Sequence, residues 1–205
     1  MERRIGLVLL AAGGATRMGM AKQLLPYRER SLLRHAAEVA VASGLAPVLV
    51  VLGAQADRLE PELAGLPVGI VTNDEWEKGM GGSIRAGMRA MQTAAAGVEA
   101  VVFTVCDQPL VGPDVIGRLV EGYLVTGKPV VASEYRGTLG VPALFARRYF
   151  PHLSGLADGG GAKRVIAGAG NAVHAVPFPG GAFDIDTPQD YERLRAVEGP
   201  PAELN

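Results

Sequence analysis

The sequence has a single cysteine, Cys106, among its 205 residues, so it holds no internal disulfide framework. The first residues show no secretory signal pattern, and we therefore expect a cytoplasmic protein. The three histidines, His35, His152 and His174, have no zinc-ligand spacing with one another or with the cysteine. Because no histidine is near Cys106 in the sequence, we interpret its thiol as a buried structural group and not as a nucleophile.

A charge excess of one sign and a long apolar run are also missing. The formal net charge is -1, which leaves no basic excess to hold a nucleic-acid backbone. Apolar stretches such as residues 47–53 are too short to span a bilayer, so no membrane partner is expected. With 48% hydrophobic residues, no internal repeat and no linker, the sequence predicts one domain over residues 1–197 and a frayed tail over residues 198–205. A small-molecule partner is favoured.

Two familiar phosphate-binding patterns are missing as well. A P-loop requires Lys-Ser or Lys-Thr directly after its second glycine, whereas Met20 follows Gly19. The dinucleotide fingerprint requires alternating glycines, and Gly13-Gly14-Ala15 lacks them. A nucleotide site in this chain must therefore be of another kind.

The chain does contain an apolar run, residues 7–10, that leads into alanines and glycines. This pattern predicts a buried strand followed by a loop with exposed backbone, where small residues let a phosphate approach and glycines allow successive N–H groups to point inward. Arg17 and Lys22 follow and would add positive charge, Arg17 as a planar fork and Lys22 as a point charge. The alternative is a surface loop with two solvated basic residues. The residues of the predicted phosphate loop are Leu10, Ala11, Ala12, Gly13 and Gly14.

Strand and helix patterns alternate along the chain, which indicates a parallel sheet covered by helices. Ser31 is expected to cap a helix that stops at Ser43 and Gly44, and Thr187 is expected to cap the last helix. Further predicted strands are residues 47–52, 68–72, 100–105, 129–133, 143–145 and 172–178, and further predicted helices are residues 57–64, 79–96, 113–125, 146–153 and 162–167.

Three aspartates are candidate metal ligands. Asp107 lies just beyond the predicted strand 100–105, at the sheet edge where open α/β folds bind ligands, and a carboxylate beside phosphates is how proteins hold Mg²⁺. The alternative is an aspartate that only caps the following turn. Asp184 and Asp186 are two residues apart, so in an extended segment both would face the same way. Either one could serve only as a helix-entry residue, and we favour Asp186 as the second Mg²⁺ ligand.

The segment from Asn73 to Ser83 combines a strand end, the only tryptophan and a glycine-rich helix entry at Gly79. Ser83 and the amides near it are candidates to hydrogen-bond a base edge or a ribose. We interpret Trp76 as a packing anchor in preference to a stacking platform, because only 5% of the residues are aromatic and a core needs them.

Residues 10–25 resemble the signature L-A-A/G-G-x-S-x-R-M-G-x-x-K-x-L-L of the nucleotidyltransferases that complete the molybdenum cofactor, the MobA/MocA-like family. Within this family the chain resembles the molybdenum cofactor cytidylyltransferase branch. The resemblance extends, in the same order, over Gly79-Met80 with Ser83, Asp107-Gln108-Pro109 and Asp184-Ile185-Asp186-Thr187-Pro188 with Asp190-Tyr191.

The resemblance implies a three-layer α/β/α sandwich with a mixed, mainly parallel sheet, similar to nucleotide-diphospho-sugar transferases. It implies that the amides of residues 10–14 hold base and triphosphate, that Arg17 and Lys22 bind phosphates, and that Asp107 and Asp186 hold Mg²⁺. The implied catalytic residues are Arg17, Lys22 and Asp107. The implied nucleotide-binding residues are Leu10, Ala11, Ala12, Gly13, Gly14, Arg17, Lys22, Asn73, Gly79, Ser83 and Asp107.

Two segments depart from the family pattern. The chain has Asp-Gly-Gly-Gly-Ala-Lys at residues 158–163 where the family usually has Gly-Asp-x-Gly-Ala-Arg, and it has Val141 where a polar residue is usual. Both segments are expected on the acceptor side of the site, so the identity of the second substrate stays open.

The activity implied by the resemblance is transfer of CMP from CTP to the terminal phosphate of molybdenum-molybdopterin, with release of pyrophosphate. Ala12 is typical of CTP-using members, whereas glycine is common at this position in GTP-using ones. A transient contact with a molybdoenzyme or its chaperone is an expected partner interaction. The alternatives are nucleotidyl transfer to a sugar or polyol phosphate, and a nucleotide-binding cofactor chaperone without turnover.

Overall fold

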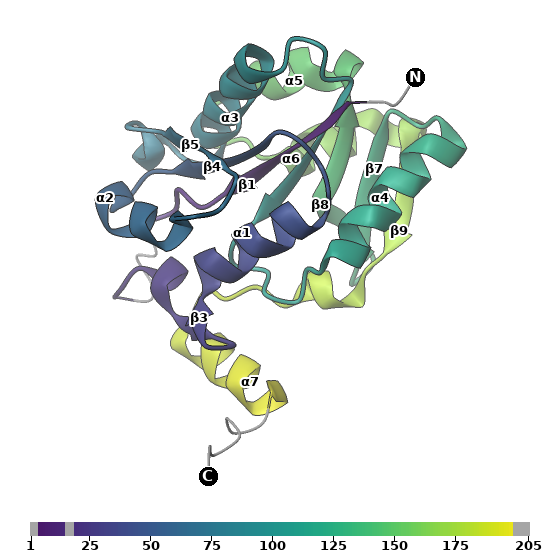
Figure 1. The fold of residues 1–205 in the computed structure, drawn as a ribbon. Coiled ribbons are helices and arrows are strands. Elements are labelled where there is room, and N and C mark those ends of the chain that lie inside the picture. The colour runs from purple at the N-terminus through teal and green to yellow at the C-terminus, as the bar shows by residue number, and fades with distance from the viewer. Residues whose placement is uncertain (1–3, 15–18, 199–205) are drawn as a thin grey trace.

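In the computed structural model, which describes residues 4–14 and 19–198, a seven-stranded sheet forms the centre of the protein (Figure 1). The strand order is β5-β4-β1-β6-β8-β7-β9. The strands are β1 (Ile5–Leu10), β4 (Val48–Leu52), β5 (Gly69–Thr72), β6 (Ala100–Val105), β7 (Val130–Tyr135), β8 (Thr138–Ala146) and β9 (Val173–Pro177).

Strand direction in the sheet is mixed but mainly parallel. Strand β1 pairs in parallel with β4 on one side and β6 on the other, so that Leu7 lies opposite both Val48 and Val102. Strand β8 runs antiparallel to its neighbours β6 and β7, and β9 returns to the parallel direction beside β7. The carboxyl ends of β1, β4, β5 and β6 therefore meet at one edge of the sheet, which is where α/β proteins bind ligands.

Helices cover both faces of the sheet, because the side chains of β1 alternate between two apolar clusters. Leu7 and Leu9 pack on one face, against α1 (Leu32–Ala42), α2 (Ala56–Leu59) and α4 (Pro113–Thr126). Val8 and Leu10 pack on the other face, against α3 (Met80–Ala94), α5 (Phe150–Ser154) and α6 (Ala162–Ala169). The two helix layers on either side of the strands are visible in Figure 1, and they confirm the predicted three-layer sandwich.

A small third cluster joins residues 25–32 to the C-terminal helix. The short hairpin of β2 (Pro26–Tyr27) and β3 (Arg30–Ser31) lies beside the last helix, α7 (Pro188–Glu198), at the lower edge of the molecule (Figure 1). The hydroxyl of Tyr191 donates a hydrogen bond to the carbonyl of Pro26 at 2.7 Å. The buried side chains of this cluster are Leu25, Tyr27, Leu32, Ile185 and Leu194.

The local predictions agree with the structure where burial is continuous and differ where it is interrupted. The strand predicted over residues 100–105 has those bounds, and the amide of Arg34 donates to the Ser31 hydroxyl at 3.0 Å, as expected of a helix cap. The hairpin β2–β3 was not predicted, and the strand predicted over 143–145 is nine residues long. Gly140 and Pro142 hid its first half, where β7 has a bulge and the Ser133 hydroxyl donates to the Pro142 carbonyl.

Other predicted boundaries are also corrected. The helix predicted over residues 146–153 is a 3-10 turn, Arg147–Tyr149, followed by the five-residue α5, because Ala146 still belongs to β8. The tail was predicted over residues 198–205, but helix α7 includes Glu198, and residues 199–205 lie outside the described residues. Within the described part of the chain, no helix has the length and apolar character needed to cross a bilayer.

The packing of α3 on the sheet predicts a strong effect of a methyl group at Gly87. A Cβ atom there would lie 2.7 Å from Val8 Cγ1 and 3.1 Å from Val51 Cγ2, both in the middle of the sheet. We expect Gly87→Ala to lower the free energy of unfolding by about 1–3 kcal/mol, because overpacking a closed core forces side chains or backbone to shift. Urea denaturation measures the change.

Gly117 in α4 is the matched control for this substitution. It is exposed, and a Cβ atom at this position would meet nothing within 4 Å. Gly117→Ala should raise the unfolding free energy by about 0.5–1 kcal/mol, since alanine has the better helix propensity. Equal effects at the two positions would contradict the close packing of α3 on the sheet.

Candidate active site

A cavity of about 500 Å³ opens at the carboxyl edge of the sheet. It is bounded by the ends of β1 and β6, the start of α3, and the segment before α7. The residues that line it are Leu10, Ala11, Ala12, Gly13, Gly14, Lys22, Gln23, Trp76, Glu77, Gly79, Met80, Ser83, Val105, Cys106, Asp107, Gln108, Tyr135, Val141, Asp184 and Asp186. The cavity therefore brings together most of the residues singled out from the sequence.

The predicted phosphate loop is held from behind by a residue that the sequence analysis missed. The side-chain amide of Gln23, which is 2% exposed, donates to the carbonyls of Ala11 and Gly13 at 2.9 and 2.7 Å. The carbonyl of Ala12 accepts from the amide of Ala54 at 3.2 Å. Three successive carbonyls are thus tied into the protein, which fixes the path of the loop. The only signal in the sequence was a polar residue between Lys22 and two leucines.

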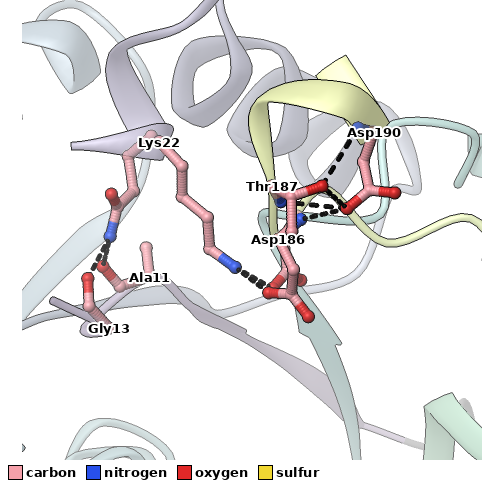
Figure 2. A network of polar contacts seen from close by, with 8 residues as sticks. Ala11, Gly13, Lys22, Asp186, Thr187 and Asp190 are labelled. Atoms are coloured by element: carbon pink, nitrogen blue, oxygen red, sulfur yellow. Dashed lines mark hydrogen bonds and ion pairs between the residues drawn. The ribbon is translucent and has the colours of Figure 1, made fainter. Parts of the chain in front are cut away.

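Lys22 joins two carboxylates that are distant in the sequence. Its ammonium nitrogen lies 2.7 Å from Asp107 Oδ2 and 2.9 Å from Asp186 Oδ1, and its side chain is only 12% exposed. Figure 2 shows the Lys22 side chain directed toward Asp186. Burial by itself would lower the pKa of Lys22, but the charge and hydrogen bonds of the two aspartates outweigh it and the pKa is raised. Lys22 is therefore a fixed positive charge at the cavity wall.

Backbone contacts hold the C-terminal aspartates next to β6. The amide of Ile185 donates to the Asp107 carbonyl at 2.9 Å, and the side-chain amide of Gln108 donates to the Gly181 carbonyl at 3.0 Å. Ile185 is fully buried in the third cluster, so Asp184 and Asp186 on either side of it both face the cavity. Burial raises the pKa of Asp184, although the nearby Gln108 side chain opposes this effect.

Asp186 also belongs to the start of the last helix. The Asp190 carboxylate accepts from the amide and hydroxyl of Thr187 at 2.9 and 2.7 Å and from the amide of Asp186 at 3.3 Å (Figure 2). The amide of Asp190 in turn donates to the Thr187 hydroxyl at 3.2 Å. This reciprocal cap, predicted at Thr187, gives Asp186 a fixed backbone position and leaves its side chain directed to Lys22.

The opposite wall is formed by the start of α3. Ser83 and Gly79 line the cavity, whereas Asn73 lies behind them and donates from its side-chain amide to the Ser83 hydroxyl at 3.0 Å. Asn73 was predicted to bind nucleotide directly, but the structure places it where it orients Ser83. The amide of Gly81 donates to the Asp158 carbonyl at 2.9 Å.

The two departures from the family pattern lie in different places. Val141 lines the cavity, on the same wall as Tyr135. Among the described residues that line the cavity, none comes from the segment 158–163. That segment packs behind α3, and the Arg85 guanidinium contacts the Leu156 carbonyl and the Asp158 carboxylate, each at 2.5 Å. The segment therefore supports the α3 wall and does not itself line this cavity.

Two further predictions concern single residues. Cys106 is buried, as expected, and burial together with the Asp107 charge raises the pKa of its thiol to about 12, so the thiol stays protonated. Trp76 is half-buried and packs on the α3-side apolar cluster, and it also lines the cavity. Arg17, a predicted phosphate ligand and catalytic residue, lies outside the described residues.

The site's chemistry is compatible with a divalent cation. Mg²⁺ usually takes one or two carboxylates from the protein and fills its other positions with water and phosphate oxygens. Asp107 and Asp186 already present carboxylate oxygens to one cationic centre, the Lys22 ammonium. No cluster of three or more histidine, cysteine, aspartate or glutamate side chains suited to a metal is found in residues 4–14 and 19–198. The donor set thus fits a cation shared with bound phosphates.

Comparison with known proteins identifies the family. The family model of the MobA-like NTP transferase domain matches residues 7–175, which include β1, the phosphate loop, α3 and Asp107. The chain belongs to the MobA-like NTP transferase family. As a member of this family it is a nucleotidyltransferase, and the cavity at the carboxyl edge of the sheet is its candidate active site.

Several MobA-like relatives can be compared in detail. PucB, a purine catabolism protein of Bacillus subtilis (strain 168), is 30% identical over 201 residues, which cover 92% of this chain and 94% of PucB. A molybdenum cofactor guanylyltransferase of Rhodobacter capsulatus is 30% identical over 197 residues, 93% of this chain and 94% of the relative. The nicotine blue oxidoreductase of Paenarthrobacter nicotinovorans is 37% identical over 142 residues, 68% of this chain and 66% of the relative.

A solved structure supports the same assignment. Rv0371c of Mycobacterium tuberculosis H37Rv, in complex with manganese, superposes with a TM-score of 0.73 at 28% identity, covering 93% of this chain and 97% of that one. The names of the relatives differ, so the MobA-like family establishes the reaction class but leaves the substrates to be argued from the site.

The Lys22 bridge predicts a loss of stability when its charge is removed. Lys22→Met keeps the apolar stem but leaves the carboxylates of Asp107 and Asp186 facing each other without a counter-charge. We expect the free energy of unfolding to fall by about 1–2 kcal/mol, less than for a fully buried pair because Asp186 is 49% exposed. Urea denaturation without divalent cations measures the change.

Lys78 provides the matched control. Its ammonium pairs with Glu75 at the surface, where an ion pair contributes little because water screens both charges. Lys78→Met should therefore leave the unfolding curve unchanged. A Lys22→Met protein as stable as the wild type would contradict the bridge.

Proposed function

We propose that the protein transfers CMP from CTP to the terminal phosphate of molybdenum-molybdopterin and releases pyrophosphate. The observation that carries the proposal is the position of Lys22. Its ammonium bridges Asp107 and Asp186 directly beside a loop of small residues, so fixed positive charge and carboxylates meet where a triphosphate would lie. The guanylyltransferase among the relatives supports a molybdenum-cofactor acceptor.

The chain's own residues supply charge and alignment in this reaction. An oxygen of the acceptor's terminal phosphate attacks the α-phosphorus of CTP, a new P–O bond forms, and the bond to the β-phosphate oxygen breaks. The loop amides and Lys22 hold the triphosphate in line and stabilise the charge that moves to the leaving pyrophosphate. No covalent intermediate is required, which agrees with a protonated Cys106 and with a cavity that no histidine lines in the described part of the chain.

Asp107 and Asp186 are the proposed ligands of a Mg²⁺ ion. When bound, the ion would neutralise phosphate charge and help to align the reacting groups. The manganese complex of Rv0371c supports a divalent cation in this family. Lys22 would then turn from the aspartates toward the phosphates.

The choice of CTP is proposed from Ala12. Its methyl group is buried beside Gly53, and Ala12 is one of the residues that line the cavity. The proposal is that this methyl group limits the space for a base. One methyl group in a pocket changes relative affinity by about 10- to 200-fold. We therefore expect a preference for CTP over GTP and not exclusion of GTP.

The proposal is tested by measuring pyrophosphate release with CTP, GTP, ATP and UTP in the presence of Mg²⁺. Each nucleotide is combined with molybdenum-molybdopterin, with a polyol phosphate, and with no acceptor. We expect release with CTP and molybdenum-molybdopterin. Faster pyrophosphate release with a polyol phosphate would show that the acceptor is a polyol phosphate and not molybdenum-molybdopterin. A faster reaction with GTP than with CTP would overturn the cytidylyl assignment. Stoichiometric nucleotide binding without release would favour a cofactor chaperone.

Ala12→Gly serves as the matched variant in the same assay. Removing the methyl group should narrow the ratio of CTP to GTP activity toward one, since glycine leaves room for the larger purine. The contacts from Gly79 and Ser83 remain and should preserve part of the preference. An unchanged ratio would remove Ala12 from the explanation.

Asp107→Asn should reduce turnover by on the order of 10²-fold or more, because it removes the charge of a proposed Mg²⁺ ligand with little change in side-chain volume. Steady-state kinetics at several Mg²⁺ concentrations measure the effect. Asp114→Asn, at an exposed position in the first turn of α4, is the control and should retain wild-type rates. An Asp107→Asn enzyme with unchanged turnover and Mg²⁺ dependence would exclude Asp107 as a ligand.

A further inference from the structure

Trp76 lies between two glycines at the wall of the cavity. It begins the 3-10 turn Trp76–Lys78, between β5 and α3, and its six-membered ring lies against Gly14. A Cβ atom on Gly14 would be 2.5 Å from Trp76 Cζ3 and 2.9 Å from Cη2. Position 14 of the phosphate loop is thus in direct contact with the edge of the indole and has no room for a side chain.

The Cβ end of the Trp76 side chain is also enclosed, which limits movement of the indole away from Gly14. A Cβ atom on Gly53 would lie 2.6 Å from Trp76 Cβ and 2.8 Å from the Ala12 carbonyl oxygen. The backbone of Trp76 is held by two hydrogen bonds, from its amide to the Asn73 carbonyl at 3.2 Å and from the Gly79 amide to its own carbonyl at 3.0 Å. A tryptophan confined at both ends is a rigid support.

We propose that Trp76 is a positioning residue that sets the conformation of the phosphate loop through its contact with Gly14. The proposal rests on the proposed function in one respect, namely that this loop binds the nucleotide. The Gln23 side chain holds the loop through the carbonyls of Ala11 and Gly13. The indole blocks displacement of the loop at the next residue, Gly14. A loop that is already ordered loses less conformational entropy when nucleotide binds.

The chain offers a matched pair of glycines for the test. A Cβ atom on Gly13 would meet nothing within 4 Å, whereas one on Gly14 would overlap Trp76. The test compares two sets of variants. The first set is Gly14→Ala, Trp76→Leu and the double variant that carries both changes. The second set replaces Gly14→Ala with Gly13→Ala, alone and together with Trp76→Leu. Leucine retains an apolar contact but lacks the ring atoms that approach Gly14. Calorimetric titration gives the Kd for CTP in each protein.

We expect Gly14→Ala to raise the Kd for CTP by about tenfold or more, and Trp76→Leu to raise it several-fold, because each disturbs the loop. In the double variant the alanine methyl fills the space left by the ring, so its Kd should be close to that of Trp76→Leu alone. In the double variant of Gly13→Ala and Trp76→Leu, the fold-changes in the Kd for CTP of the two single variants should multiply. Trp76→Leu should raise the KM for CTP with kcat within about threefold of wild type, since the loop contacts nucleotide before and during the reaction.

Emission from Trp76 gives an independent readout in the wild type, because it is the only tryptophan in the chain. Its fluorescence should change on titration with CTP, with the same Kd as calorimetry. If Gly14→Ala fails to fold, Trp76→Phe and Trp76→Leu are compared instead. We then expect the Kd for CTP to rise from wild type to Trp76→Phe to Trp76→Leu. An unchanged Kd in both variants overturns the inference.

The outcomes separate this inference from the proposed function. Effects of Gly14→Ala and Trp76→Leu that simply multiply, in a protein whose wild type binds CTP, would overturn the role of Trp76 and leave the proposed function standing. A wild-type protein that binds no nucleotide would overturn both.

Discussion

The candidate active site depends on one ammonium group held between two carboxylates from distant parts of the chain. Lys22 follows the first strand, Asp107 follows β6, and Asp186 precedes the last helix, so their contact requires the C-terminal segment to return to the edge of the sheet. Other hydrogen bonds hold the backbone on which these charges sit. The amide of Ile185 donates to the Asp107 carbonyl, and the Thr187–Asp190 cap fixes the backbone of Asp186. The carboxylates of Asp107 and Asp186 are therefore positioned by contacts that do not involve Lys22.

Much of the fold could be predicted because burial on both faces produces unbroken apolar runs, as in residues 100–105. Strand direction could not be predicted in this way. Strand β8 is antiparallel, but its apolar sequence pattern does not differ from that of a parallel strand. In addition, Gly140 and Pro142 conceal the first half of the strand. Direction is decided by which neighbours cover the strand, and this information is absent from a local pattern.

The candidate site was predictable where a residue's position in an element determines its surroundings. Asp107 follows a buried strand, and Asp184 and Asp186 alternate with a buried isoleucine, so their shared direction follows from extended geometry. Gln23 could not be predicted, because the carbonyls it binds are brought to it only by the folded loop. Asn73 does not line the cavity but hydrogen-bonds the Ser83 hydroxyl, a contact between two elements that the sequence does not show.

A binding loop made of alanines and glycines has no side chains with which to maintain its own shape. Its conformation must come from neighbours, and here they are Gln23, whose amide holds two of its carbonyls, and Ala54, whose backbone holds a third. Under the proposed function, discrimination between bases would depend on this surrounding layer as well as on Ala12. A single methyl group contributes about 1–3 kcal/mol to such a choice. A change in one of these supporting residues would therefore alter the loop without changing any residue of the loop itself.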